Sequence, residues 1–167
     1  MRFENNILIF SPSDLMTFQE SPFASYMERW KLIDPTVESY MDSEDPILGA
    51  LAQKGFEHEN KFTEKLKKEG RSIIVIERDE YQKMRRNTHE AMKSGVDVIV
   101  QAYLSSSDFS GFSDYMIRRS GSSKFGDYHY EIWDAKLARK IKPHFAIQLC
   151  VYSEMIEDIQ GFRPHRA

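Results

Sequence analysis

The segments Phe109-Ser-Gly-Phe-Ser-Asp-Tyr-Met-Ile117 and Tyr130-Glu-Ile-Trp-Asp-Ala-Lys136 decide the fold predicted for this chain. Both are rich in aromatic and β-branched residues, and a Ser/Gly-rich stretch separates them, so they are predicted to form two strands of a hairpin. Because side chains alternate along a strand, Asp134 and Lys136 are expected on one face. Pairing of the two strands then brings Asp114 beside them. Two carboxylates and an ammonium group in one place can bind a divalent cation and act on phosphate.

Hydrophobic spacing outside this hairpin predicts further helices and strands. Ser11, Pro12 and Asp14 have the pattern of a helix start, and Pro22 is expected to split that helix. The remaining helices are predicted at 47–69, 81–94 and 144–158, and the strands at 72–77, 96–104, 109–118 and 128–136. We therefore expect an α/β fold with a mixed, mostly antiparallel central sheet flanked by helices.

The two ends of the chain suggest its domain organisation. Residues 1–167 are long enough for one domain with its own core. The last eight residues, 160–167, look like the lead-in to a strand that does not follow. We expect a single domain whose last core strand is missing, as in the N-terminal fragment of a longer protein.

Composition limits the class of protein. Hydrophobic residues make up 41% and charged residues 29% of the chain, as in soluble globular proteins. No apolar run could span a bilayer, and the N-terminus lacks the pattern of a signal peptide. The single cysteine, Cys150, excludes a disulfide framework and a four-cysteine iron–sulfur cluster, and it is expected to pack inertly in the core. A cytoplasmic location follows as the expectation.

The net charge of −3 argues against a general polyanion binder. A local basic strip would still allow nucleic acid to bind, and Arg139, Lys140 and Lys142 are its candidates. The lysines between 61 and 68 are better explained as a solvated helix face.

Two helices carry further candidate residues. His58 faces inward on the helix 47–69, where a lone histidine is more often a satisfied core residue than a metal ligand. Gly55, one turn earlier, is expected to allow a close backbone approach. Gln148 and Tyr152 share a face of the last helix, and the glutamine could cap a strand or reach a phosphate. The Asp-x-Lys triplet has its own alternative, a surface salt bridge at a strand end.

Five short motifs follow one another along the chain: Ser11-Pro-Ser-Asp-Leu15, Gly55-Phe-Glu-His58, Gly111-Phe-Ser-Asp114, Asp134-Ala-Lys136 and Gln148-Leu-Cys-Val-Tyr152. In this order they resemble the motifs of the RecB-like nucleases of the PD-(D/E)XK superfamily, and the chain is similar to CRISPR-associated exonucleases. The resemblance implies a restriction-endonuclease-like core. The chain departs from many of these relatives in lacking the cysteines of their iron–sulfur cluster and the last strand.

The resemblance also implies a role for each matched residue. His58, Asp114, Asp134 and the backbone carbonyl of Ala135 would hold Mg²⁺ or Mn²⁺, and Lys136 would be the catalytic lysine. The implied substrate-binding residues are Gln148 and Tyr152, with Arg139 and Lys140 from the basic strip.

Three functions remain open from the sequence. The first is a metal-dependent DNA nuclease acting on single-stranded DNA or on free ends, as an exonuclease. The second is a catalytically inactive DNA-binding or scaffolding module of a larger helicase or nuclease protein. The third is an enzyme that acts on another phosphate ester. The expected partners are DNA, a helicase or C-terminal domain and a second copy of the chain, with no membrane partner.

Overall fold

The computed structural model describes residues 1–41, 46–138, 140 and 142–166. In chain order the elements are β1 (Arg2–Glu4), β2 (Ile7–Ile9), α1 (Pro12–Glu20), α2 (Pro22–Lys31), the 3₁₀ helix η1 (Pro35–Tyr40), α3 (Pro46–Lys68), β3 (Ile73–Val75), α4 (Tyr81–Ser94), β4 (Val98–Ser105), β5 (Ser110–Ser123), β6 (Gly126–Trp133) and α5 (Pro143–Gln160).

The central sheet has four strands in the order β3-β4-β5-β6. β3 runs parallel to β4, and the other two pairings are antiparallel. The prediction of an α/β protein with a mixed, mostly antiparallel sheet is confirmed. A separate hairpin of β1 and β2 was not predicted. Its turn consists of Asn5 and Asn6, which both have positive φ, as a tight hairpin turn requires.

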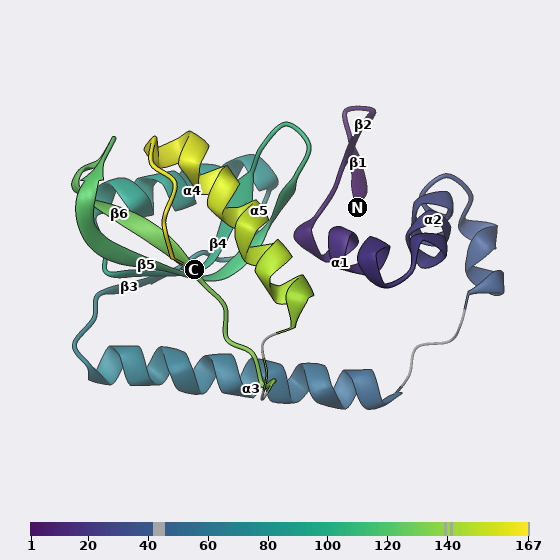
Figure 1. Ribbon diagram of the computed structural model, residues 1–167, viewed down its shortest axis with the longest axis horizontal. Helices are drawn as coiled ribbons and strands as arrows, with labels where there is room; N and C mark the ends of the chain where they lie inside the picture. Colours follow the sequence, from purple (N-terminus) through teal and green to yellow (C-terminus); the bar gives the residue numbers. More distant parts are fainter. Residues whose placement is uncertain (42–45, 139, 141, 167) are drawn as a thin grey trace.

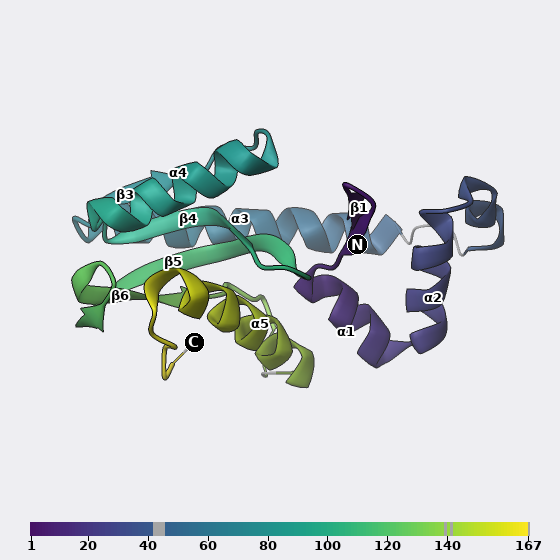
Figure 2. The same ribbon diagram turned by 90° about the horizontal axis from the view of Figure 1, so that it is seen from above.

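Helices cover both faces of the sheet (Figures 1 and 2). On one face, Phe62 and Leu66 of α3 pack against Val98 and Tyr115 of the sheet. On the other, apolar side chains of α4 and α5 form a larger cluster with the opposite sheet face. That cluster includes Met84, Met92, Ile99, Met116, Tyr152 and Ile156. Burial of these two apolar clusters holds α3 on one face of the sheet and α4 and α5 on the other, which gives three layers.

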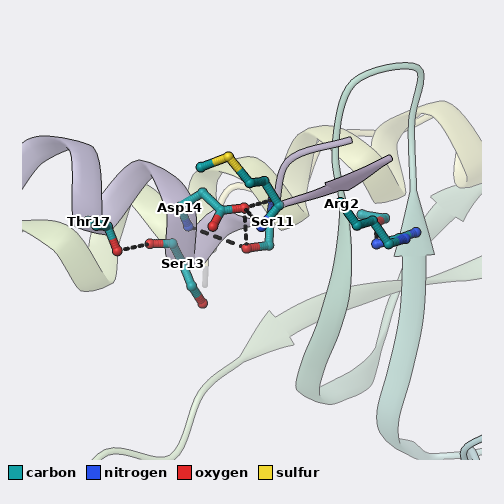
Figure 3. A network of polar contacts seen from close by, with 7 residues as sticks. Arg2, Ser11, Ser13, Asp14 and Thr17 are labelled. Carbon is teal, nitrogen blue, oxygen red and sulfur yellow. Dashed lines mark hydrogen bonds and ion pairs between the residues drawn. The ribbon is translucent and has the colours of Figure 1, made fainter. Parts of the chain in front are cut away.

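The start of α1 is built as the sequence predicts (Figure 3). The backbone nitrogen and the hydroxyl of Ser11 donate to one carboxylate oxygen of Asp14, at 2.6 and 2.8 Å. The backbone nitrogen of Asp14 donates back to the Ser11 hydroxyl at 3.3 Å, which completes a capping box. The α-amino group of Met1 lies 2.6 Å from the same carboxylate. The predicted break at Pro22 is also confirmed, with Ser21 capping α2.

β6 is an edge strand, and a side chain covers part of its edge. Gln160 is 0% exposed, and its amide accepts from the backbone nitrogen of Tyr130 at 2.9 Å and donates to the Tyr130 carbonyl at 3.1 Å. A neighbouring strand would make the same two bonds. Gly161 then ends α5 in the left-handed conformation, with φ 67°. Within the described residues 161–166 no strand follows.

Two local predictions are wrong. Gly55 was expected to allow close backbone approach, but a Cβ at this position would meet no atom within 4 Å. Cys150 was expected in the core but is exposed, because it lies on the solvent side of α5. Among the described helices, none combines the length and the apolar composition needed to cross a bilayer.

Candidate functional site

Asp114 and Asp134 meet at the end of the β5–β6 pairing. Tyr115 is paired with Trp133, so the next position on each strand carries one of the two carboxylates. The backbone nitrogen of Ala135 donates to Asp114 at 3.3 Å. The predicted strand through Lys136 is too long, because β6 ends at Trp133. Asp134 and Lys136 therefore lie just beyond the strand, and their side chains meet as an ion pair.

Asp134 is a buried carboxylate. Its side chain is 7% exposed, whereas that of Lys136 is 36% exposed. Lys136 Nζ lies 2.9 Å from Asp134 Oδ2. Even so, neither buried oxygen of Asp134 has a donor in hydrogen-bonding geometry within the described part of the chain. A carboxylate buried in this way requires compensation by positive charge. The alternative of a salt bridge at a strand end is therefore observed, with a buried carboxylate and a partly exposed ammonium group.

Asp114, the neighbour of Asp134, has a raised pKa. Burial, then contact with Asp134 and the negative charges of Asp134 and Glu59, together raise the pKa of Asp114 to about 8. Lys136 acts in the opposite direction. Two carboxylates this close favour either a bound proton or a bound cation between them. The pair thus has the electrostatic property expected of a cation site.

Glu59 of α3 is a site residue that the sequence analysis missed. Burial raises its pKa, and Lys136 and Asp134 are close enough to act on it in opposite directions. The Tyr115 hydroxyl donates to the backbone carbonyl of Glu59 at 2.7 Å and lies 2.9 Å from the Thr63 hydroxyl, which holds α3 over β5. The sequence signal was available, because Glu59 and Thr63 are one helical turn apart.

Gln101 is a second residue without a prediction. It lies on β4 between Val100 and Ala102, which pair with Tyr115 and Ser113 on either side of Asp114. Its φ of 54° is left-handed, an uncommon conformation for a residue other than glycine. Its amide nitrogen lies 3.5 Å from the carboxylate of Glu59. No sequence pattern indicates this backbone conformation.

α5 supplies the predicted face with Gln148 and Tyr152. The Tyr152 hydroxyl donates to the carbonyl of Phe112 at 2.8 Å, and burial followed by the charge of Asp114 raises its pKa. The amide oxygen of Gln148 is buried and has no hydrogen-bond partner among the described residues. Lys136 Nζ lies 5.6 Å from the centre of the Phe145 ring on the same helix. The structure thus brings the first half of α5 to the carboxylate pair.

Among the described residues, neither His58 nor Lys140, the next predicted site residues, forms a hydrogen bond or an ion pair with the carboxylate pair. His58 is partly buried on α3 and acts electrostatically on Glu59. Lys140 is exposed before α5, and Arg139 lies outside the described residues. Across the described ranges, no three His, Cys, Asp or Glu side chains form a group that could hold a metal ion. The predicted set of His58, Asp114 and Asp134 is therefore not assembled around one point.

Comparisons with protein-family models, curated proteins and solved structures find no match to this chain.

Proposed function

We propose that this protein is a divalent-metal-dependent nuclease with a restriction-endonuclease-like core, as its resemblance to the RecB-like nucleases implies. The observation that carries the proposal is the pair of Asp114 and Asp134. The Asp134 carboxylate is buried and has only the Lys136 ammonium group as an ion-pair partner among the described residues, and the pKa of Asp114 is raised to about 8. A cation between two such groups removes their mutual repulsion.

The donor set suits Mg²⁺ or Mn²⁺, which prefer oxygen ligands. In this proposal Asp114, Asp134 and the carbonyl of Ala135 hold the ion. Glu59 is a better candidate than His58 for the contribution from α3, because its charge acts directly on Asp114. When bound, the ion would polarise the phosphate and lower the pKa of a water molecule.

Lys136 and α5 perform the remaining tasks. The ammonium group of Lys136 is partly exposed beside Asp134, so it can bind a phosphate oxygen or orient the attacking water. Gln148 has a buried free oxygen, suited to accepting a hydrogen bond from a water molecule or an amino group of the substrate. Tyr152 braces β5 through its bond to Phe112. These are positioning roles for residues that the chain already holds near the carboxylates.

The substrate and partners in this proposal come from the resemblance. They are single-stranded DNA or DNA with free ends, cut exonucleolytically, with Arg139 and Lys140 contacting the backbone. A helicase or a C-terminal domain, and a second copy of the chain, are the proposed partners. The cytoplasm is the proposed location, in keeping with a chain that has one cysteine.

Calorimetric titration with Mn²⁺ tests the metal site. We expect saturable binding by the wild type, none by Asp134→Asn, and unchanged binding by Asp127→Asn. Asp127 is the control because it is an exposed carboxylate on β6, the strand that precedes Asp134. Circular dichroism must show that all three are folded. Absence of binding by the folded wild type contradicts the proposal.

Release of nucleotides from 5′- and 3′-labelled single-stranded DNA then tests catalysis. Lys136→Ala should keep Mn²⁺ binding and lose activity by about 10²- to 10⁴-fold, as expected for removal of a proton-transfer or charge-stabilising group. A variant with wild-type activity would remove Lys136 from the mechanism.

An inactive DNA-binding or scaffolding module is the second candidate. It is favoured by the ion pair between Lys136 and Asp134 at 2.9 Å, which compensates the buried carboxylate without a metal ion. Binding of single-stranded DNA without Mn²⁺ binding or cleavage would support it. Hydrolysis of mononucleotides without cleavage of DNA would instead favour an enzyme acting on another phosphate ester.

A further inference from the structure

A cavity of about 930 Å³ lies apart from the carboxylate pair, between α4, the β4–β5 turn and the end of α5. The residues used below all line it: Arg85, Arg86, His89, Ser105, Ser106, Ser107 and Asp158. None of the candidate site residues contributes to this lining. Its size is in the range of cavities that bind small organic ligands.

Two arginines give the cavity its charge. Arg85 and Arg86 are exposed, and no acidic side chain of the described residues pairs with either of them. The other cations of α4 are paired: Lys83 with Asp79, and Lys93 with Glu90 at 3.6 Å. The cations that remain available on this helix are therefore the two that face the cavity.

The opposite wall of the cavity carries hydroxyl groups. Ser106 and Ser107 use theirs within the turn, with Phe109 and Asp108. The hydroxyl of Ser105 has no hydrogen-bond partner in the described part of the chain. The turn and α4 are held in place, because the backbone nitrogen of Tyr103 donates to the buried hydroxyl of Thr88 at 3.1 Å. Ser105, with a free hydroxyl, and the two arginines without acidic partners thus line one cavity.

We infer that this cavity binds a phosphate group, carried either by a free nucleotide or by a nucleic-acid strand. Guanidinium groups bind phosphate oxygens through paired, charge-assisted hydrogen bonds, and a serine hydroxyl adds a further donor. The imidazole of His89, one turn after Arg85, widens the set of donors. Asp158 opposes the anion with one carboxylate against two guanidinium groups, so it should weaken binding without abolishing it.

Binding measurements in EDTA test the inference independently of the metal site. The probes are inorganic phosphate, adenosine monophosphate and a fluorescent single-stranded deoxythymidine oligonucleotide, each at low salt. The double variant Arg85→Ala/Arg86→Ala removes the two cavity cations. The double variant Lys83→Ala/Lys93→Ala removes the same charge from the same helix, outside the cavity.

We expect the wild type to bind at least one probe and the arginine variant to bind about tenfold more weakly or worse. The lysine variant should stay close to wild type, and Asp158→Asn should bind more tightly. Binding of the mononucleotide without preference for the strand identifies a free phosphorylated ligand. Preference for the strand, with a smaller salt dependence in the arginine variant, identifies nucleic acid.

Equal losses in the two double variants would overturn the inference, because they would show a response to overall charge alone. Failure of the folded wild type to bind any of the three probes would also overturn it. Neither result bears on Mn²⁺ binding by Asp114 and Asp134.

Discussion

The metal-free protein should lose stability as the pH rises from about 4 to about 8. The cause is Asp114, whose pKa in the folded protein is raised from 3.8 to about 8, first by burial and then by its contact with Asp134. Between these values the folded state keeps a proton that the unfolded state releases. The folded state then binds more protons, so the free energy of unfolding decreases with rising pH. The stability that protonated Asp114 contributes is fully present below pH 3.8 and is lost above about pH 8.

The magnitude follows from the size of the shift. At about 1.4 kcal/mol per pKa unit, a shift from 3.8 to about 8 corresponds to at most about 6 kcal/mol. Asp114 is only partly buried, and small movements that admit water reduce the effect of desolvation. We therefore expect the free energy of unfolding to fall by about 2–3 kcal/mol over this window. Glu59 adds in the same direction, because burial raises its pKa as well.

Urea denaturation in EDTA at a series of pH values between 4 and 9 measures how the free energy of unfolding changes with pH. Asp114→Asn removes the titrating group and should flatten the profile, while Asp127→Asn, an exposed carboxylate on β6, should keep the wild-type slope. Mn²⁺ at pH 8 should stabilise the wild type and leave Asp114→Asn unchanged. Parallel profiles for the wild type and Asp114→Asn would refute the reasoning.

Three further predictions concern stability, each measured by urea denaturation at pH 7. Gln160→Ala should cost about 2–4 kcal/mol, because it removes two buried hydrogen bonds to Tyr130 and a partly buried one to Phe162; a loss below about 1 kcal/mol would contradict the role of Gln160 in covering the edge of β6. Ser11→Ala should cost about 1 kcal/mol through the capping box, whereas Ser13→Ala, two residues later and exposed, should cost little. Gly55→Ala should stabilise α3 by about 0.5–1 kcal/mol, since no atom lies where the methyl group would be placed; destabilisation would reveal a contact at that face.

The local elements could largely be predicted because their signals are short-range. Ser11, Pro12 and Asp14 define the start of α1 through bonds that span only three residues. Gly95 ends α4 in the left-handed conformation that few other residues adopt readily, with φ 68°. Alternating apolar residues were enough to place β4, β5 and β6 within a few positions.

The candidate site was only partly predictable. The sequence order of Asp114, Asp134 and Lys136 was sufficient to expect their meeting, since a hairpin pairs neighbouring segments in a defined register. The end of β6 at Trp133 was missed, although Asp134, Ala135 and Lys136 are residue types that are less common in strands than those of residues 130–133. Glu59 was passed over for His58, one position away, although Glu59 lies three residues before Phe62 and seven before Leu66, which pack on the sheet.

The amino-acid sequence alone was enough to predict the α/β class of the fold and the proximity of Asp114, Asp134 and Lys136. Hairpin register and helix periodicity depend on residues that are close in the chain, so both can be predicted from the sequence. Packing defines the rest. The rotation of α3 that brings Glu59 to the carboxylates depends on Tyr115 and Thr63, which are far apart in the chain. The altered pKa of Asp114 arises from burial, which no single residue encodes. The charge of the cavity between α4 and the β4–β5 turn likewise depends on which cations of α4 form ion pairs with acidic side chains in the folded chain.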